Sequence, residues 1–428
     1  MYTSIFRLKN KTVCLFLALV TTFLIIKSIY GILMYKSVPI LLWWTPFVEV
    51  ERVIRCDNYS CLLTSDRVYK NHSRLSAYLF YGSRFNPTDL PIGLKHIPWS
   101  IFHEESPKNL GLFLYRDGQS VFNITSTFDQ HSDFPVPLQY LRDIESLTSR
   151  QYYIPIEKKK NLLKNHAPVL YIQSDCNTPI ERDMIVAELM KYIKVDSYGV
   201  CLNNKKLPDS LKESDVYSFP YHNLIMQLAA SYKFTIAIEN ARCDDYITEK
   251  LWRSLIVGSV PIYLGAPNVG DWLPNNKSAI LIGNFESIES LASYIIKVNQ
   301  DNNLYLNYLD HKEKLNFGHQ ITNKRLINLL KRGKYGLEGN QEDVVPAFEC
   351  FICRNIHTNG FKKQKQETVY SCPEPKSRNS KNPVRWKDHW KRGKCEGKVL
   401  KELLEQQKNY SKNDYEYKVD QYYKNNMC

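Results

Sequence analysis

Residues 234–265 read as one complete strand–helix–strand unit, and this unit constrains the fold more than any other stretch of the chain. The β-type run Phe234–Ile238 is short enough to be a strand that is buried on both faces. Thr248 is placed to cap a helix with an apolar stripe, Gly258 ends that helix, and residues 260–265 form a second strand. Such units join the strands of a parallel sheet, so the sequence predicts an α/β fold.

Polar residues of this unit fall where parallel sheets usually bind ligands. Outside the carboxyl ends of the strands, helix N-termini offer free N–H groups and positive dipole ends to anions. One cation, two acids and several hydrogen-bonding groups gather there, which suits a ligand carrying both phosphate and hydroxyls. From spacing alone, an ordinary helix start with a charged first turn explains them equally well. The residues are Glu239, Asn240, Tyr246, Thr248, Glu249 and Lys250.

Strand and helix patterns alternate on both sides of this unit and predict two α/β domains. We place a first domain at residues 38–157, a second at 165–345 and a basic, cysteine-containing tail at 346–428. Three lysines at 158–160 are interpreted as a solvated hinge. The tail is interpreted as accessory or partly disordered, with one short helix at 399–407. Expected first-domain segments are strands 39–44, 76–81, 99–103 and 110–115 and the segment 144–153; the second domain has strands 168–173, 196–200 and 279–282 and helices 180–193, 223–231 and 288–298.

The N-terminus contains an apolar run at residues 13–34, preceded by Arg7, Lys9 and Lys11. A helix of about 20 apolar residues spans a bilayer, and positive charge before it keeps the N-terminus cytosolic. We therefore predict a type II signal anchor with a cytosolic tail at 1–12. The rest of the chain would then lie in the lumen of the endoplasmic reticulum or Golgi. A cleaved signal peptide is the alternative, but no small-x-small cleavage site follows the run.

Sequons and cysteine usage fit a lumenal body. Ten of the eleven cysteines lie beyond the apolar run, which suits an oxidising compartment. Three pairs are close enough in sequence to close small loops, although connectivity cannot be read from sequence: Cys56/Cys61, Cys350/Cys353 and Cys372/Cys395. Zinc binding by Cys350 and Cys353 with His357 is an alternative that lacks a second matching pair. Candidate N-glycosylation sites are Asn58, Asn71, Asn123, Asn276 and Asn409.

The last residue of the expected strand Trp99–His103 opens an acidic stretch, HEESPKN at residues 103–109. A carboxylate at a strand end that faces an interdomain cleft can act as a base toward an acceptor hydroxyl. The same stretch also fits a solvated strand end.

Several motifs are absent from the sequence. Without a DxD triplet, diphosphate binding through a bridging metal is not indicated, and we expect no metal and no cofactor. Without GxGxxG or GxxxxGK[ST], a dinucleotide oxidoreductase or a P-loop NTPase is not indicated. The net charge of +13 lies mostly after Cys353 and comes with no nucleic-acid-binding motif, so no nucleic-acid partner is expected.

The central unit resembles the donor-binding signature of the α1,3-fucosyltransferase superfamily, glycosyltransferase family 10, in the run IENARCDDYITEKLWRSLIVGSVPIYLG. The similarity covers most of residues 43–353, with matching stretches at 102–109, 171–189 and 195–202. It is closest to the divergent fucosyltransferase ten and eleven branch, which resembles protein O-fucosyltransferases. The resemblance implies the GT-B architecture, in which two Rossmann-like domains face each other across a cleft. The first domain would be the acceptor side and the second would bind GDP-fucose.

Roles for individual residues also follow from the resemblance. Glu105 matches the glutamate of the family's ESP motif, held to be the general base, and Glu104 and His103 could tune it through a hydrogen bond. Lys250 and Arg182 would stabilise the departing diphosphate, although the stretch before Arg182 departs from the usual SNxxxxxAR pattern. From the residues alone, Lys250 could also be a surface lysine paired with an acid. The remaining donor-side residues are Tyr246, for phosphate or nucleotide, Glu249, for ribose or fucose hydroxyls, and Asn240, which would line the same corner.

Together these features predict a membrane-anchored, metal-independent, inverting fucosyltransferase that uses GDP-β-L-fucose. The ten and eleven branch implies that the acceptor is Ser or Thr of cysteine-rich EMI domains. The alternative acceptor is N-acetylglucosamine of glycans, fucosylated at its 3-position. A second alternative is a non-catalytic lumenal sugar-binding or folding factor. The set of site residues argues against it, because a binding module needs no base.

Overall fold

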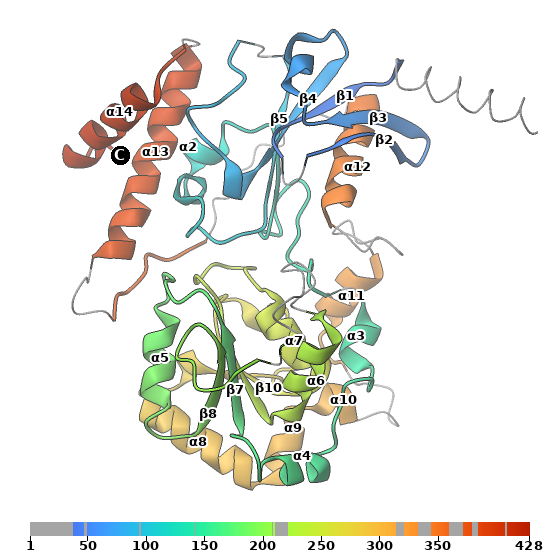
Figure 1. Ribbon diagram of the computed structural model, residues 1–428, viewed down its shortest axis with the longest axis vertical. Helices are drawn as coiled ribbons and strands as arrows, with labels where there is room; N and C mark the ends of the chain where they lie inside the picture. Colours follow the sequence, from blue (N-terminus) through green and yellow to red (C-terminus); the bar gives the residue numbers. More distant parts are fainter. Residues whose placement is uncertain are drawn as a thin grey trace, which may run out of the picture.

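The computed structural model describes residues 37–46, 49–93, 96–141, 143–207, 209, 221–313, 321–332, 344–358, 371–378, 384–406 and 409–428. These residues form two α/β domains, each built on its own sheet (Figure 1). The predicted anchor at 13–34 lies outside the described residues. Among the helices that are described, none is both long and apolar enough to cross a membrane.

The first sheet is parallel except at one edge, where β2 runs antiparallel to β3. Side chains alternate along its central strand β1, so that Ile40 and Leu42 lie in one apolar cluster and Leu41 and Trp43 in another. Both faces of the sheet are therefore buried. In sheet order the strands are β2 (Glu51–Cys56), β3 (Tyr59–Thr64), β1 (Ile40–Thr45), β4 (Leu75–Tyr81), β5 (Trp99–His103) and β6 (Ile124–Thr127).

The strand predicted at residues 110–115 is wrong. This buried apolar run forms the 3₁₀ helix η3 (Gly111–Leu114), and the short helix α2 (Arg116–Gln119) follows it. Strand β6, and not this run, pairs with β5 and forms the edge of the sheet. The run packs instead against a helix from the C-terminal part of the chain.

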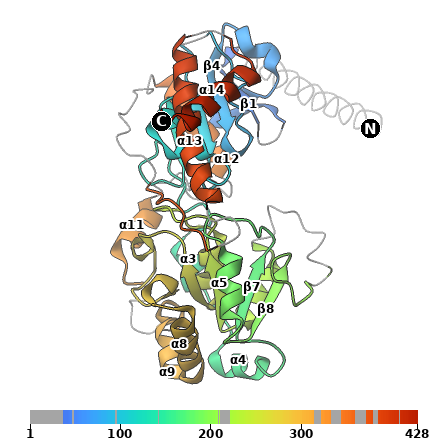
Figure 2. The ribbon, with the colours of Figure 1, turned by 90° about the vertical axis from the view of Figure 1, so that its left-hand side faces the viewer.

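In the described residues, the C-terminal part of the chain completes the first domain. The prediction of an accessory tail is wrong for these residues. Helix α12 (Val344–His357) covers the sheet face of Leu41 and Trp43, with Phe348 in the same cluster. Helix α13 (Arg385–Gln406) covers the opposite face and pairs with α14 (Lys412–Lys424) (Figures 1 and 2). The predicted short helix at 399–407 is only the end of α13. A sheet that is apolar on both faces needs two covers, and these helices provide them.

The disulfides join segments that are distant in sequence, and all three predicted local pairs are wrong. In the β2–β3 hairpin Cys56 lies opposite Tyr59 and Cys61 opposite Ile54, so these two cysteines do not face each other. They reach the two cysteines of α12 instead. All ten cysteines of the described residues are paired, as Cys56–Cys350, Cys61–Cys353, Cys176–Cys201, Cys243–Cys372 and Cys395–Cys428.

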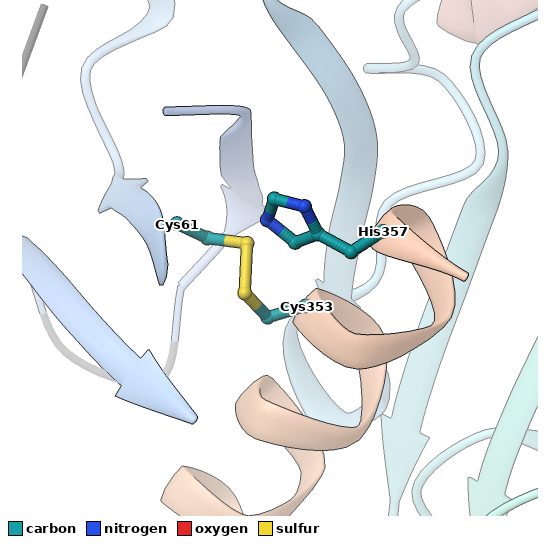
Figure 3. Close-up of side chains that lie close together, drawn as sticks. All are labelled: Cys61, Cys353 and His357. Carbon is teal, nitrogen blue, oxygen red and sulfur yellow. A yellow bond between two sulfur atoms is a disulfide. The ribbon is translucent and has the colours of Figure 1, made fainter. Parts of the chain in front are cut away.

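Zinc binding by the cysteines of α12 is excluded by this pairing. Figure 3 shows the disulfide between Cys61 and Cys353 with His357 beside it. Two sulfurs bonded to each other cannot serve as thiolate ligands. The imidazole of His357 stacks on Tyr59, with ring centroids 4.9 Å apart, and its Nε2 hydrogen-bonds to the Ser60 carbonyl at 3.0 Å.

The second sheet is parallel throughout. Its central unit is formed as predicted, since Thr248 caps α7 through its side chain and Gly258 ends it with a left-handed φ of 71°. In sheet order the strands are β11 (Ile280–Leu281), β10 (Val260–Leu264), β9 (Phe234–Ile238), β7 (Val169–Gln173) and β8 (Val195–Gly199). Helices α5 (Arg182–Leu189) and α8 (Ile288–Gln300) cover one face, and α6 (Asn223–Ser231) and α7 (Glu249–Val257) the other.

The predicted hinge is also wrong. Residues 158–160 lie in α4 (Ile156–Leu162), and Lys159 is fully buried. Its Nζ donates hydrogen bonds to the carbonyls of Tyr232, at 2.9 Å, and Gly258, at 2.7 Å. These carbonyls end α6 and α7, where helix carbonyls lack partners within the helix. Lys159 therefore provides hydrogen-bond donors for the terminal carbonyls of two helices, although it lies in a run of lysines.

The segment predicted to close the first domain packs on the second. Leu147 of α3 (Ile144–Thr148) lies in one apolar cluster with Leu251 and Trp252 of α7. The other elements are η1 (Arg67–Asn71), η2 (Gly82–Arg84), η6 (Val269–Asp271), η7 (Ile282–Asn284), α9 (Asn302–Asn307), α10 (Asp310–Glu313) and α11 (Lys324–Arg332).

Candidate active site

The residues predicted on the two domains lie close enough for their charges to interact. Glu105 follows β5 of the first domain, and Lys250 and Glu249 open α7 of the second. Burial raises the pKa of Glu105, the charge of Lys250 opposes that shift, and the charge of Glu249 adds to it. A second contact joins the loop of Glu105 to the second domain, an ion pair between Lys108 and Asp175 of the loop after β7. The acceptor-side carboxylate therefore lies within electrostatic reach of the donor corner, by which we mean Arg182, Asn240, Tyr246, Glu249 and Lys250.

Lys250 is the cation of a buried cluster rather than a surface lysine. Its Nζ lies 3.0 Å from Glu249 Oε1 and 3.8 Å from Glu239 Oε2, and it donates to Thr248 Oγ1 at 3.0 Å. Glu239 has no exposed surface and accepts hydrogen bonds from the backbone N–H and hydroxyl of Thr248, at 2.8 and 2.7 Å. Only 10% of the Lys250 side chain is exposed, so its charge is weakly screened.

Glu249 is held ionised by two cations. Burial alone would raise its pKa, but Lys250 and Arg253 outweigh that effect and lower the pKa to about 2. A carboxylate that stays charged and partly accessible is a hydrogen-bond acceptor for hydroxyl groups. Sequence reasoning missed Arg253, which is buried. Its spacing of four residues from Glu249 on one helix was the signal that could have identified it.

Arg182 is used to tie two loops of the donor corner together. Its Nη1 donates to Asn240 Oδ1 at 2.7 Å and to the Ile238 carbonyl at 3.3 Å, and its Nη2 donates to the Asp175 carbonyl at 2.7 Å. Its side chain is buried, and its Nε has no partner among the described residues. The structure therefore brings Arg182 and Asn240 together, as predicted for one corner, but it leaves little of the guanidinium exposed.

Tyr246 lies at the boundary between the domains. Its ring packs edge-on against Phe128 of the first domain, with centroids 5.1 Å apart, and it is almost fully buried. Burial raises the pKa of its hydroxyl well above 10, and Glu105 and Glu239 raise it further. Tyr246 is therefore a neutral phenol between the acceptor-side and donor-side acids.

Glu104 and His103, which precede Glu105, do not make the contacts that the sequence predicts. Glu104 accepts a hydrogen bond from the Tyr81 hydroxyl at 3.1 Å, and burial raises its pKa to about 7. His103 is fully buried, and neither ring nitrogen has a partner among the described residues. Burial lowers its pKa to about 3, so the ring is neutral and packs against Phe113. The predicted hydrogen bond from His103 to the base is absent.

Tyr140 joins the site from the segment between the domains, and sequence reasoning missed it. Burial raises the pKa of its hydroxyl well above 10, and the charges of Glu249, Glu105 and Glu104 raise it further. Its backbone carbonyl accepts a hydrogen bond from the Tyr221 hydroxyl at 2.5 Å. No local motif marks a single tyrosine of this kind, because only the packing of the two domains places it beside three acids.

Comparison with known proteins identifies the family. Residues 158–371 match the family model described as "Glycosyltransferase family 10 (fucosyltransferase) C-term", and residues 35–139 match "Fucosyltransferase, N-terminal". The chain belongs to glycosyltransferase family 10. The resemblance stated from the sequence is confirmed, and the protein is a glycosyltransferase of the fucosyltransferase family. Both matched regions end before residue 372, so α13 and α14 lie beyond them.

Curated relatives extend over most of the chain. The human protein named "GDP-fucose protein O-fucosyltransferase 3" is 40% identical over 402 residues, covering 89% of this chain and 82% of the relative. The Gallus gallus protein of that name is 38% identical over 397 residues, covering 88% and 82%. Among solved structures, "Crystal Structure of alpha1,3-Fucosyltransferase with GDP" aligns with a TM-score of 0.42 and 19% identity, covering 72% of this chain and 92% of that one.

Proposed function

We propose that this protein transfers L-fucose from GDP-β-L-fucose, with inversion, to Ser or Thr of cysteine-rich EMI-type domains. The observation that carries the proposal is the placement of Glu105 opposite the Lys250–Glu249 pair. The acceptor oxygen attacks C1 of fucose and its proton passes to Glu105. The bond from C1 to the β-phosphate oxygen breaks, and GDP leaves. The product is an α-linked fucose.

In this proposal each of the remaining residues binds or supports a different part of GDP-fucose. Lys250 compensates the charge that develops on the departing diphosphate. Glu249 accepts hydrogen bonds from sugar hydroxyls, and Tyr246 binds phosphate or nucleotide. Arg182 acts mainly by holding Asn240 and the loop after β7 in place. Because cationic side chains compensate the charge of the diphosphate, we propose that the transfer needs no metal. The two α/β domains and the family membership support a GT-B arrangement.

The acceptor class is the part of the proposal that goes furthest beyond the family. Support comes from the relatives named protein O-fucosyltransferase 3. The choice of EMI domains follows from the resemblance to the fucosyltransferase ten and eleven branch. N-acetylglucosamine of glycans is the alternative acceptor.

We propose further that residues 13–34 anchor the protein as a type II membrane protein, with the catalytic body in the lumen of the endoplasmic reticulum or Golgi. The complete pairing of the ten described cysteines supports an oxidising compartment. The asparagines of all five sequons are exposed, as glycosylation requires: Asn58, Asn71, Asn123, Asn276 and Asn409.

Transfer of labelled fucose from GDP-fucose tests the proposal. The full chain, solubilised in detergent, is offered a folded EMI-type domain and, separately, an N-acetylglucosamine-terminated glycan, with and without a metal chelator. We expect label on the EMI domain, released by treatment that cleaves O-linked sugars, and no effect of the chelator. Label only on the glycan would establish the alternative acceptor. Label on neither, with GDP still bound, would contradict the proposed transfer.

The pH dependence of the reaction provides a separate prediction. A general base must be deprotonated, and burial raises the pKa of Glu105. The rate should therefore fall as the pH drops through this raised pKa, at a higher pH than the ordinary glutamate value of about 4.3. Glu249, with its pKa of about 2, stays ionised across that range. The measurement is kcat/KM against pH, and an acidic limb at or below the ordinary value would contradict the environment assigned to Glu105.

A further inference from the structure

The chain from the end of the family-matched region onward reaches both halves of the candidate active site. Residues 371–378 lie against the second domain, and α13 packs on the first. Both ribbon views show this extended segment passing between the two domains beside the end of α13 (Figures 1 and 2). We call residues 371–378 together with α13 the C-terminal clasp.

On the second domain the clasp holds two loops of the donor corner. A disulfide joins Cys372 to Cys243, which lies in the loop between Asn240 and Tyr246, and the N–H of Asp244 donates to the Ser371 carbonyl at 2.9 Å. Glu181, next to Arg182, accepts a hydrogen bond from the Ser377 hydroxyl at 2.9 Å, and another from the backbone N–H of Arg378. Both loops that Arg182 ties together are thus attached to the clasp.

On the first domain the clasp supports the loop of the base. Nε2 of His389 on α13 hydrogen-bonds to the Pro107 carbonyl at 2.9 Å, two residues after Glu105. Gly393 lies so close to Gly111 that a Cβ on it would approach the Gly111 backbone to 2.6 Å. Gly397, one turn later, would bring a Cβ within 2.8 Å of the Gly118 nitrogen. Because these two glycines have no side chain, α13 packs directly against the backbone of residues 111–118, which follow the loop of Glu105.

We propose that the C-terminal clasp positions Glu105 relative to the donor corner and so sets the geometry of transfer. This inference rests on the proposed function. Lys108 and Asp175 join the two loop regions through an ion pair, whereas the clasp adds a covalent link. A misplacement of about 1 Å between reacting groups can reduce a rate about 10²-fold. The clasp residues are positioning residues, because they act through the loops and do not touch the reacting atoms.

Two paired disulfide variants of the full chain test the proposal. C243S/C372S removes the link between the donor corner and the clasp, and C56S/C350S removes a link between β2 and α12, which lies outside the clasp and where Cys61–Cys353 remains. We expect C243S/C372S to lower kcat at least about 10-fold, with a smaller change in KM for GDP-fucose. C56S/C350S should keep kcat within about twofold of wild type. Equal losses in both, or no loss in C243S/C372S, would overturn the positioning role.

A second pair of variants covers the case in which a disulfide variant does not fold. Gly393→Ala pushes α13 away from Gly111, whereas Gly283→Ala meets no atom within 4 Å and serves as the control. Gly393→Ala should lower kcat more than it raises KM, and Gly283→Ala should do neither. An unchanged kcat in Gly393→Ala would contradict the clasp.

Amide hydrogen exchange separates failure of the clasp from failure of the proposed function. We expect faster exchange in residues 104–109 and 240–246 when C243S/C372S is compared with C56S/C350S. This readout needs no acceptor. If wild type transfers no fucose, the proposed function fails, and the exchange data still decide whether the clasp orders both loops. Unchanged exchange in both stretches would overturn the clasp.

Discussion

Glu105→Gln is expected to lower kcat about 10³-fold, within the range for loss of a general base. The amide has nearly the same shape but cannot take the proton of the acceptor hydroxyl. Lys250 and Glu249, which face Glu105, keep their own contacts, so affinity for GDP-fucose should change less than about threefold. The measurement is transfer kinetics together with direct binding of GDP-fucose.

Glu104→Gln is the matched comparison for that variant. Glu104 is the adjacent carboxyl, but it is hydrogen-bonded to Tyr81, and burial raises its pKa to about 7. We expect it to lower kcat about 10-fold or less, because it acts through its neighbour. If Glu104→Gln is the more damaging of the two, the assignment of the base to Glu105 is wrong.

Lys250→Met should damage both transfer and stability. Loss of the cation beside the leaving group is expected to lower kcat/KM by about 10²-fold or more. The fully buried Glu239 then loses its cationic partner, and removing one member of a buried pair costs about 3–5 kcal/mol in the free energy of unfolding. Chemical denaturation and transfer kinetics measure the two effects.

The double variant Glu239→Gln/Lys250→Met separates these two effects. A neutral amide at position 239 still accepts a hydrogen bond from Thr248 and no longer needs a cation. Stability should therefore recover most of the loss while transfer stays low. Recovery of transfer along with stability would mean that Lys250 acts only through the fold.

Much of the donor corner was determined by local sequence. The unit around β9 and α7 has a short buried strand, a threonine cap and a terminal glycine, and each feature acts through near neighbours in the chain. Helix capping and strand burial depend on such short-range chemistry, so the unit and the position of Lys250 were predictable. The acidic stretch at Glu105 was recognisable for the same reason, because it directly follows a predictable strand.

Only the tertiary structure decided which distant segments meet. Cys243 and Cys372 are separated by 129 residues, and nothing local to either one specifies the other. Lys159 lies in a run of lysines that reads as solvated, yet its ammonium reaches two helix ends because the packing of α4 puts it there. The role of α13 as a cover for the first sheet likewise follows from an apolar face that the N-terminal part of the chain leaves open. Local sequence thus determined the chemical groups of the site, whereas long-range packing decided the disulfide partners, the clasp and how Glu105 faces Lys250.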